Sequence, residues 1–193
     1  MKKRHDYKFL LLVAVIMVAG IGIAYAALST TLTITFGTIT QNALTWDVGF
    51  TGTSATATAG GTSATGRTCG NATITASSVT IANTTLSKPG DKCTWELTVA
   101  NNGTVNATLG GITPTAPTSI TCGTASGANL VCGNITYNLT TDSGGSTLLT
   151  TGGALNSGAT QKIYLVAKYN ASGLQSSAIT HNGAKFTLTY NQA

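Results

Sequence analysis

Short segments that alternate between apolar and polar side chains recur along this chain, whereas signals for helices are weak. In residues 93–100, for example, one face would carry Cys93, Trp95, Leu97 and Val99. A period of two places side chains on one face of a β-strand. Thr, which favours strands, supplies 38 of the 193 residues, and Glu occurs once. The pattern predicts an all-β fold, an antiparallel β-sandwich of immunoglobulin-like type.

Turn residues such as Pro89 and Gly90 separate the alternating segments. The predicted strands cover residues 28–36, 43–50, 72–75, 79–82, 93–100, 104–109, 119–122, 130–139, 162–169 and 184–190. The predicted core contains Trp46, Val48, Phe50, Trp95, Leu97, Val99, Ile135, Tyr137, Ile163, Leu165, Phe186 and Leu188. Residues 51–66 are of low complexity and are expected to form a flexible surface excursion. We assign the sandwich domain to residues 37–193.

The N-terminus has the three marks of a secretory signal peptide. Residues 2–8 are rich in Lys and Arg, residues 9–24 carry no charge, and Ala24-Tyr25-Ala26 places small residues at both recognition positions. We assign residues 1–26 to a signal peptide with cleavage after Ala26, which predicts a secreted, extracellular product. The alternative is an uncleaved membrane anchor, because the apolar run is long enough to span a bilayer.

Removal of the signal peptide leaves a small net charge and few reactive side chains. Residues 27–193 hold six basic residues (Arg67 and five Lys) against three Asp and one Glu, a difference of +2. No basic cluster remains, so we expect no nucleic-acid partner, and membrane contact only through the signal segment of the precursor. His181 is the only remaining histidine, and Asp91 and Glu96 are expected to be solvated rather than paired. The composition predicts that the protein is not an enzyme and has no catalytic residues, cofactor or metal site.

The chain contains four cysteines, and an even number in an exported protein favours two disulfides. Three pairings are possible. We favour Cys122–Cys132, which closes a short Gly-rich loop and leaves Cys69–Cys93. Zinc binding is the rival interpretation, but the chain has no C-x-x-C spacing and almost no histidine.

Seven Asn-x-Ser/Thr sequences are possible N-glycosylation sites. They begin at Asn71, Asn83, Asn102, Asn106, Asn134, Asn138 and Asn170. Several lie beside predicted turns, where a glycan would project into solvent. Because charges are few, hydroxyl groups and sugars would supply most of the hydration of the surface.

The segment directly after the signal peptide is a strand by its pattern. Residues 27–36 carry no charge, and one face would present Leu28, Thr30, Leu32, Ile34 and Phe36. A free apolar strand is prone to pair with an open sheet edge. It either pairs within its own sandwich or adds to the sheet of another subunit, which makes it a candidate donor strand and subunit contact.

Several short motifs occur in a recognisable order. After the signal come residues 35–39 (TFGTI), 44–47 (LTWD), 86–92 (LSKPGDK), 101–104 (NNGT) and 155–158 (LNSG). This order resembles the TasA/camelysin family of secreted biofilm-matrix fibre proteins. The low charge and the four cysteines are closest in character to the archaeal bundling-pilus subunits related to that family.

The resemblance implies a jelly-roll-like sandwich that polymerises head-to-tail by donating residues 27–36 to the next subunit. We therefore expect a structural protein, the subunit of an extracellular filament such as a pilus or biofilm-matrix fibre, whose partners are identical copies. The low surface charge also favours lateral contacts between filaments. The alternative is a membrane-anchored surface adhesin or envelope domain that keeps an uncleaved N-terminal helix, and an extracellular hydrolase is a third interpretation.

Overall fold

The computed structural model describes residues 11–12, 14–15, 43–61, 66–170, 181 and 183–193. The chain forms two compact units, Met1–Asn42 and Ala43–Ala193. The described residues of the first unit are helical. Within the described parts of the chain, no helix has the length and apolar character needed to cross a membrane. The predicted cleavage site at Ala26 and the predicted strand at residues 27–36 lie outside the described residues.

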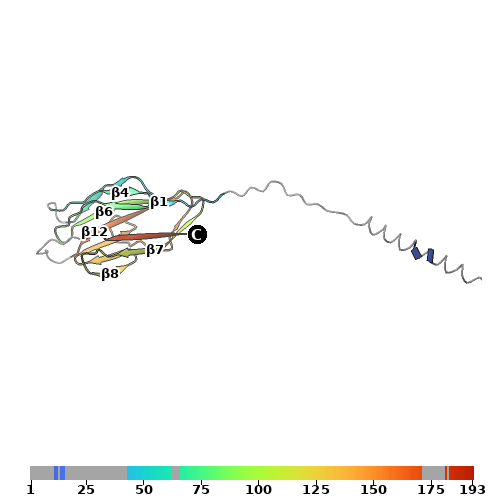
Figure 1. The fold of residues 1–193 in the computed structure, drawn as a ribbon. Coiled ribbons are helices and arrows are strands. Elements are labelled where there is room, and N and C mark those ends of the chain that lie inside the picture. Colours follow the sequence, from blue (N-terminus) through green and yellow to red (C-terminus); the bar gives the residue numbers. More distant parts are fainter. Residues whose placement is uncertain (1–10, 13, 16–42, 62–65, 171–180, 182) are drawn as a thin grey trace, which may run out of the picture. The chain divides into compact units, whose positions relative to one another are not determined.

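The second unit is built from antiparallel strands, which confirms the all-β prediction (Figure 1). The strands are β1 (Val48–Thr51), β2 (Ser54–Ala55), β3 (Ala57–Gly60), β4 (Ala72–Thr75), β5 (Ser78–Ile81), β6 (Lys92–Asn101), β7 (Ala107–Thr115), β8 (Cys122–Ser126), β9 (Asn129–Cys132), β10 (Ile135–Thr140), β11 (Ala154–Leu155), β12 (Thr160–Tyr169) and β13 (Lys185–Gln192).

These strands form one large sheet and two small sheets. The large sheet has seven strands, in the order β1-β6-β12-β10-β9-β8, with β3 also paired to β6. The small sheets have the orders β11-β7-β13 and β2-β4-β5. Side chains from all three sheets belong to a single hydrophobic cluster. Both small sheets therefore pack on the same core as the large sheet.

The long strands β6 and β12 form the centre of the large sheet. Their register pairs Leu97 with Ile163 and Trp95 with Leu165. Cys93, Trp95, Leu97 and Val99 are all buried, as the alternating pattern predicted. Burying a large apolar side chain contributes about 1.5–3 kcal/mol, so this face of β6 is a major source of stability.

Residues 51–66 depart from the predicted surface excursion. They contain β2 and β3, and β3 pairs with β6 so that Ala57 lies opposite Trp95. Ala57 is partly buried against the core. The prediction was wrong for these strands because Ala55 and Ala57, whose small side chains give only a weak strand signal, pack against the core.

Two further strand predictions need correction. Residues 130–139 form two strands, β9 and β10, joined at Gly133 and Asn134. Gly133 has φ of 56°, a left-handed conformation that favours glycine and suits a tight hairpin turn. The strand predicted at residues 119–122 is displaced, since β8 begins at Cys122.

The core prediction was wrong for Trp46, whose side chain is 47% exposed. The strand predicted at residues 43–50 begins only at Val48, which pairs with Asn101, the last residue of β6. The preceding residues run past the end of β6 and bond to the turn that follows it, where the carbonyl oxygens of Thr45 and Asp47 accept from the N–H groups of Thr104 and Asn102. Some predicted core residues are only partly buried against the cluster: Val48, Phe50, Tyr137, Leu165, Phe186 and Leu188. The prediction missed Leu109, Leu130, Leu139, Leu149 and Leu155, which are all buried.

Candidate functional site

The edge strand β13 combines an open backbone with a row of apolar side chains. Within the described residues, β7 is its only strand partner, and β13 lies beside it in red in Figure 1. Phe186, Leu188 and Tyr190 pack against the core but remain only partly buried, while Thr187 and Thr189 between them are exposed. An edge of this kind offers unpaired N–H and C=O groups to an added strand.

The other sheet edges differ in length and polarity. The last four residues of β8, at the edge of the large sheet, are small and exposed, and β11 has two residues. β5 is more similar to β13, because Val79 and Ile81 are partly buried members of the same core cluster. β4 is the only strand partner of β5 in the described part of the chain. β1, at the other edge of the large sheet, also carries the partly buried Val48 and Phe50, but it has four residues and the N–H of Phe50 already donates to the carbonyl oxygen of Ala76. β13 is therefore the longest edge at which an apolar strand would meet apolar neighbours.

The two small sheets are separate from each other in the described part of the chain. Among the described residues, no backbone hydrogen bond joins the sheet β11-β7-β13 to the sheet β2-β4-β5. Both nevertheless contribute side chains to one core. A strand added at the edge of β13 would lengthen the sheet β11-β7-β13.

The side chains predicted to supply such a strand lie outside the described residues. They are Leu28, Thr30, Leu32, Ile34 and Phe36. Their contact with another subunit stays a prediction. The described unit provides the candidate receiving edge.

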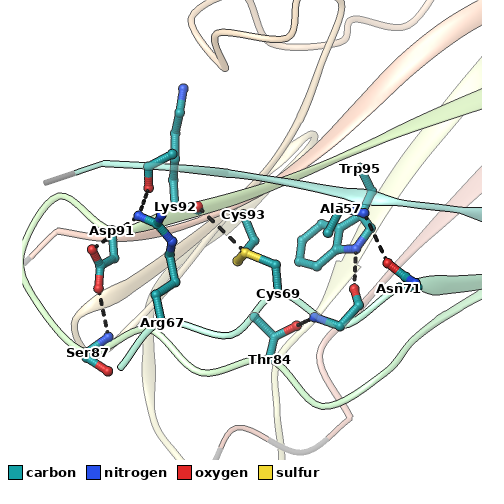
Figure 2. Close-up of a disulfide and its surroundings, with 12 residues drawn as sticks. Ala57, Arg67, Cys69, Asn71, Thr84, Ser87, Asp91, Lys92, Cys93 and Trp95 are labelled. Atoms are coloured by element: carbon teal, nitrogen blue, oxygen red, sulfur yellow. Dashed lines mark hydrogen bonds and ion pairs between the residues drawn. A yellow bond between two sulfur atoms is a disulfide. The ribbon is translucent and has the colours of Figure 1, made fainter. Parts of the chain in front are cut away.

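Two disulfides tie the described unit together, with the pairing that the sequence favoured. Cys69–Cys93 joins the segment before β4 to the inner face of β6 (Figure 2). Cys122–Cys132 joins β8 to β9, where the two cysteines are register partners. Each bond stabilises the fold by about 2–4 kcal/mol. Disulfides persist in oxidising compartments, so both are compatible with an extracellular location.

A buried ion pair lies beside the Cys69–Cys93 disulfide (Figure 2). Asp91 is fully buried, and its Oδ1 lies 3.6 Å from Nη1 of Arg67. Its Oδ2 accepts hydrogen bonds from the backbone N–H groups of Ser87 and Lys88, at 3.0 and 2.9 Å. Arg67 also donates to the carbonyl oxygen of Gly60 at 2.6 Å. One carboxylate thus fastens the turn before β6 to the segment that follows β3.

The expectation that Asp91 is solvated was wrong. The alternation of β6 would have revealed its burial, because Asp91 is in phase with Cys93 and Trp95, two residues that face the core. Because Pro89 and Gly90 directly before it predict a turn, the sequence prediction leaves Asp91 outside the alternating strand. Glu96, in the opposite phase, is exposed as expected.

Glu96 takes part in a surface cluster on the outer face of the large sheet. Its carboxylate lies 2.7 Å from Nζ of Lys162 and accepts a hydrogen bond from the hydroxyl of Tyr164 at 3.1 Å. The hydrogen bond from Lys162 lowers the pKa of Glu96. Exposed ion pairs of this type contribute about 0–1 kcal/mol, so the cluster adds little to stability.

The seven candidate glycosylation sequences differ in the accessibility of their amides. Asn83 and Asn102 are exposed, lie outside strands, and make no side-chain hydrogen bond among the described residues. Asn71 and Asn106 are exposed but accept hydrogen bonds from backbone N–H groups, and Asn170 donates to the hydroxyl of Thr136. Asn134 and Asn138 are partly buried, and Oδ1 of Asn138 is buried without a partner. Asn83 and Asn102 are thus the most accessible acceptors.

His181 lies apart from the ionisable clusters. It is partly buried, its ring centroid lies 6.0 Å from that of Tyr137, and burial lowers its pKa. In the part of the chain that the structure describes, no group of three or more His, Cys, Asp or Glu side chains is placed to hold a metal ion.

Asp142 organises the turn between β10 and β11. Its carboxylate accepts hydrogen bonds from the backbone N–H groups of Thr147, at 2.6 Å, and of Ser146, at 3.2 Å. These bonds lower the pKa of Asp142 from 3.8 to about 2. The turn is therefore stabilised by the ionised form of Asp142.

We expect the stabilising effect of Asp142 to disappear in acid. A carboxyl group whose pKa is lowered in the folded state stabilises the fold at pH values above its unfolded pKa of 3.8. This stabilisation is lost as the pH falls through the folded pKa of about 2. Melting temperatures of the wild type and of Asp142→Asn should therefore differ by a constant amount above about pH 5, approach each other as the pH falls from about 4, and converge near pH 2. A difference that persists unchanged at pH 2 would contradict this assignment.

Comparison with protein-family models, curated proteins and solved structures gives no match for this chain. Inference about its function therefore depends on the edges and side chains of the described unit. Among these, the edge of β13 is the feature best suited to bind a partner.

Proposed function

We propose that this protein is the structural subunit of an extracellular filament, in which residues 27–36 of one copy add as a strand to the next copy. The observation that carries the proposal is the edge of β13. This strand is eight residues long and presents Phe186, Leu188 and Tyr190 in a half-buried state. An added strand would bond to the unpaired backbone groups and cover these side chains.

The proposed donor strand matches this edge in length and in pattern. Its inserted face would contain Leu28, Leu32, Ile34 and Phe36, with Thr30 as the polar member. Burying four such apolar side chains would contribute roughly 6–12 kcal/mol, at about 1.5–3 each. Ordering of the free terminus and association offset part of this gain. Gly37, directly after the strand, would allow the chain to bend toward its own sandwich.

Strand donation of this type is head-to-tail. The donor and acceptor surfaces differ, so each added copy presents a new acceptor, and the assembly grows as an open filament. Before cleavage after Ala26, the signal segment would hold the donor strand at the membrane and hinder early polymerisation. A structural role of this kind requires no cofactor, no catalytic site and no partner other than identical copies.

Two observations favour a location outside the cell and contact between filaments. The disulfides Cys69–Cys93 and Cys122–Cys132 suit an oxidising compartment. The chain without its signal carries few charges, so like-charge repulsion between filaments is weak. We propose that the filaments associate laterally through Thr, Asn and attached glycans.

Electron microscopy and N-terminal sequencing of the native protein test the proposed function together. We expect filaments whose first residue is Ala27. The alternative, a membrane-anchored surface domain, predicts Met1 or Lys2 as the first residue and no filaments. That second result would overturn the proposal.

A further inference from the structure

Two large apolar side chains are exposed at the start of the described sandwich unit. Leu44 is 70% exposed and Trp46 is 47% exposed. Among the other described residues of this unit, the only large apolar side chain exposed to a similar degree is Leu148, at 39%. Single exposed apolar residues are common, but Leu44 and Trp46 are two residues apart on one segment.

The segment that carries this pair is held in place by hydrogen bonds. The carbonyl oxygen of Thr45 accepts from the N–H of Thr104 at 2.9 Å, and the N–H of Thr45 donates to the Thr104 hydroxyl at 2.9 Å. The carbonyl oxygen of Asp47 accepts from the N–H of Asn102 at 2.8 Å. A Cβ at Gly103 would lie 2.5 Å from the carbonyl oxygen of Thr45, so glycine permits this close approach.

The turn beneath the segment is itself fixed from the core side. Asn101 is fully buried, and its Nδ2 donates to the carbonyl oxygens of Val105 and Leu155, at 2.8 and 2.9 Å. Its Oδ1 accepts from the N–H of Gly103 at 3.1 Å. Leu44 and Trp46 therefore flank a firmly attached residue, Thr45, and are exposed at a defined position.

We propose that Leu44 and Trp46 contact a second copy of this chain, the copy that receives residues 27–36. This inference rests on the proposed function. Contact with that copy would remove both side chains from water, which is favourable for apolar surface. The contact would add a second interface to the one made by the donor strand.

The length of the connection supports a second copy as the occupant. Seven residues, Gly37 to Ala43, separate Phe36 from Leu44, and an extended chain of that length spans at most about 28 Å. A compact unit the size of Ala43–Ala193 is about 38 Å across. With Phe36 seated on the neighbour, the start of the described unit lies at most about 28 Å from Phe36, which is less than the width of one unit and keeps it within reach of the surface of that neighbour. Leu44 and Trp46 are the exposed apolar side chains at this start.

Tryptophan fluorescence provides a direct test, because Trp46 and Trp95 are the only tryptophans in the chain. Trp95 is buried, with 1% exposure, whereas Trp46 is accessible to a soluble quencher. Between unassembled full-length subunits and filaments, we expect acrylamide quenching of Trp46 to fall several-fold and the emission to shift to shorter wavelength. Filaments of Trp46→Phe should show neither change. Filaments in which Trp46 is quenched as strongly as in free subunits would overturn this contact and leave the proposed function intact.

Assembly thermodynamics gives a second test with a matched control. Leu44→Ser and Trp46→Ser should each raise the critical concentration for assembly about tenfold or more. Leu148→Ser, at the other exposed apolar residue, should change it by about twofold or less. Melting of the unassembled subunits should be the same for all three variants. Equal changes in critical concentration for Leu44→Ser and Leu148→Ser would overturn the contact. Complete absence of filaments in the wild type would overturn the proposed function and this contact with it.

Discussion

Deletion of residues 27–36 should abolish filament formation and leave a folded monomer. Among the described residues, the core cluster is built from side chains of Ala43–Ala193, so we expect this unit to fold without the deleted segment. The deletion removes the apolar face of the proposed donor strand, whose burial would contribute roughly 6–12 kcal/mol. Sedimentation and electron microscopy of the deletion variant measure the loss. If this variant still forms normal filaments, the strand belongs to its own subunit and strand donation is wrong.

A synthetic peptide of residues 27–36 supplies the matched control. Added to the deletion variant, it should raise the melting temperature and slow amide exchange in β13, because its backbone would pair with that edge. A peptide with Ile34→Asp should lose most of this effect, since the carboxylate would enter the core. A peptide with Thr33→Asp, on the opposite face, should retain most of it. Protection in β5 rather than β13 would assign the strand to the other open edge.

Asp91→Asn should lower the free energy of unfolding by about 3–5 kcal/mol. The change leaves the Arg67 guanidinium without its buried counter-ion and weakens the bonds from the N–H groups of Ser87 and Lys88. Small domains are stable by about 5–15 kcal/mol in total, so the loss is a large fraction. Urea denaturation of the deletion monomer, with its disulfides intact, measures the change without interference from assembly.

Glu96→Gln is the matched control for that change. It removes a carboxylate that lies 2.7 Å from Nζ of Lys162, closer than the 3.6 Å between Asp91 and Arg67. The side chains of Glu96 and Lys162 are, however, largely exposed. We expect a loss below about 1 kcal/mol. If Asp91→Asn also lowers the free energy of unfolding by less than about 1 kcal/mol, burial does not increase the contribution of the Asp91 carboxylate to stability.

Local pattern alone was sufficient to predict the fold class and the buried face of β6. A strand places alternate side chains on opposite faces wherever it lies, so the inner face of β6 could be assigned from Cys93, Trp95, Leu97 and Val99. The disulfide pairing also followed from spacing, because Cys122 and Cys132 are close in sequence. These features depend on short stretches of chain and little on what packs against them.

Other features depend on where neighbouring strands begin and end, which no short stretch contains. Trp46 continues the alternation of β1 but is exposed, because it lies before the start of β1, where the chain bonds to the turn after β6 and not to a strand. Asp91 lies in a segment with the composition of a solvated turn, but it is buried. Its carboxylate is compensated by Arg67 and by the N–H groups of Ser87 and Lys88. β13 is a predicted strand like the others, and its open edge follows from sheet order. A strand pattern specifies which side chains share a face, whereas burial and pairing require the rest of the fold.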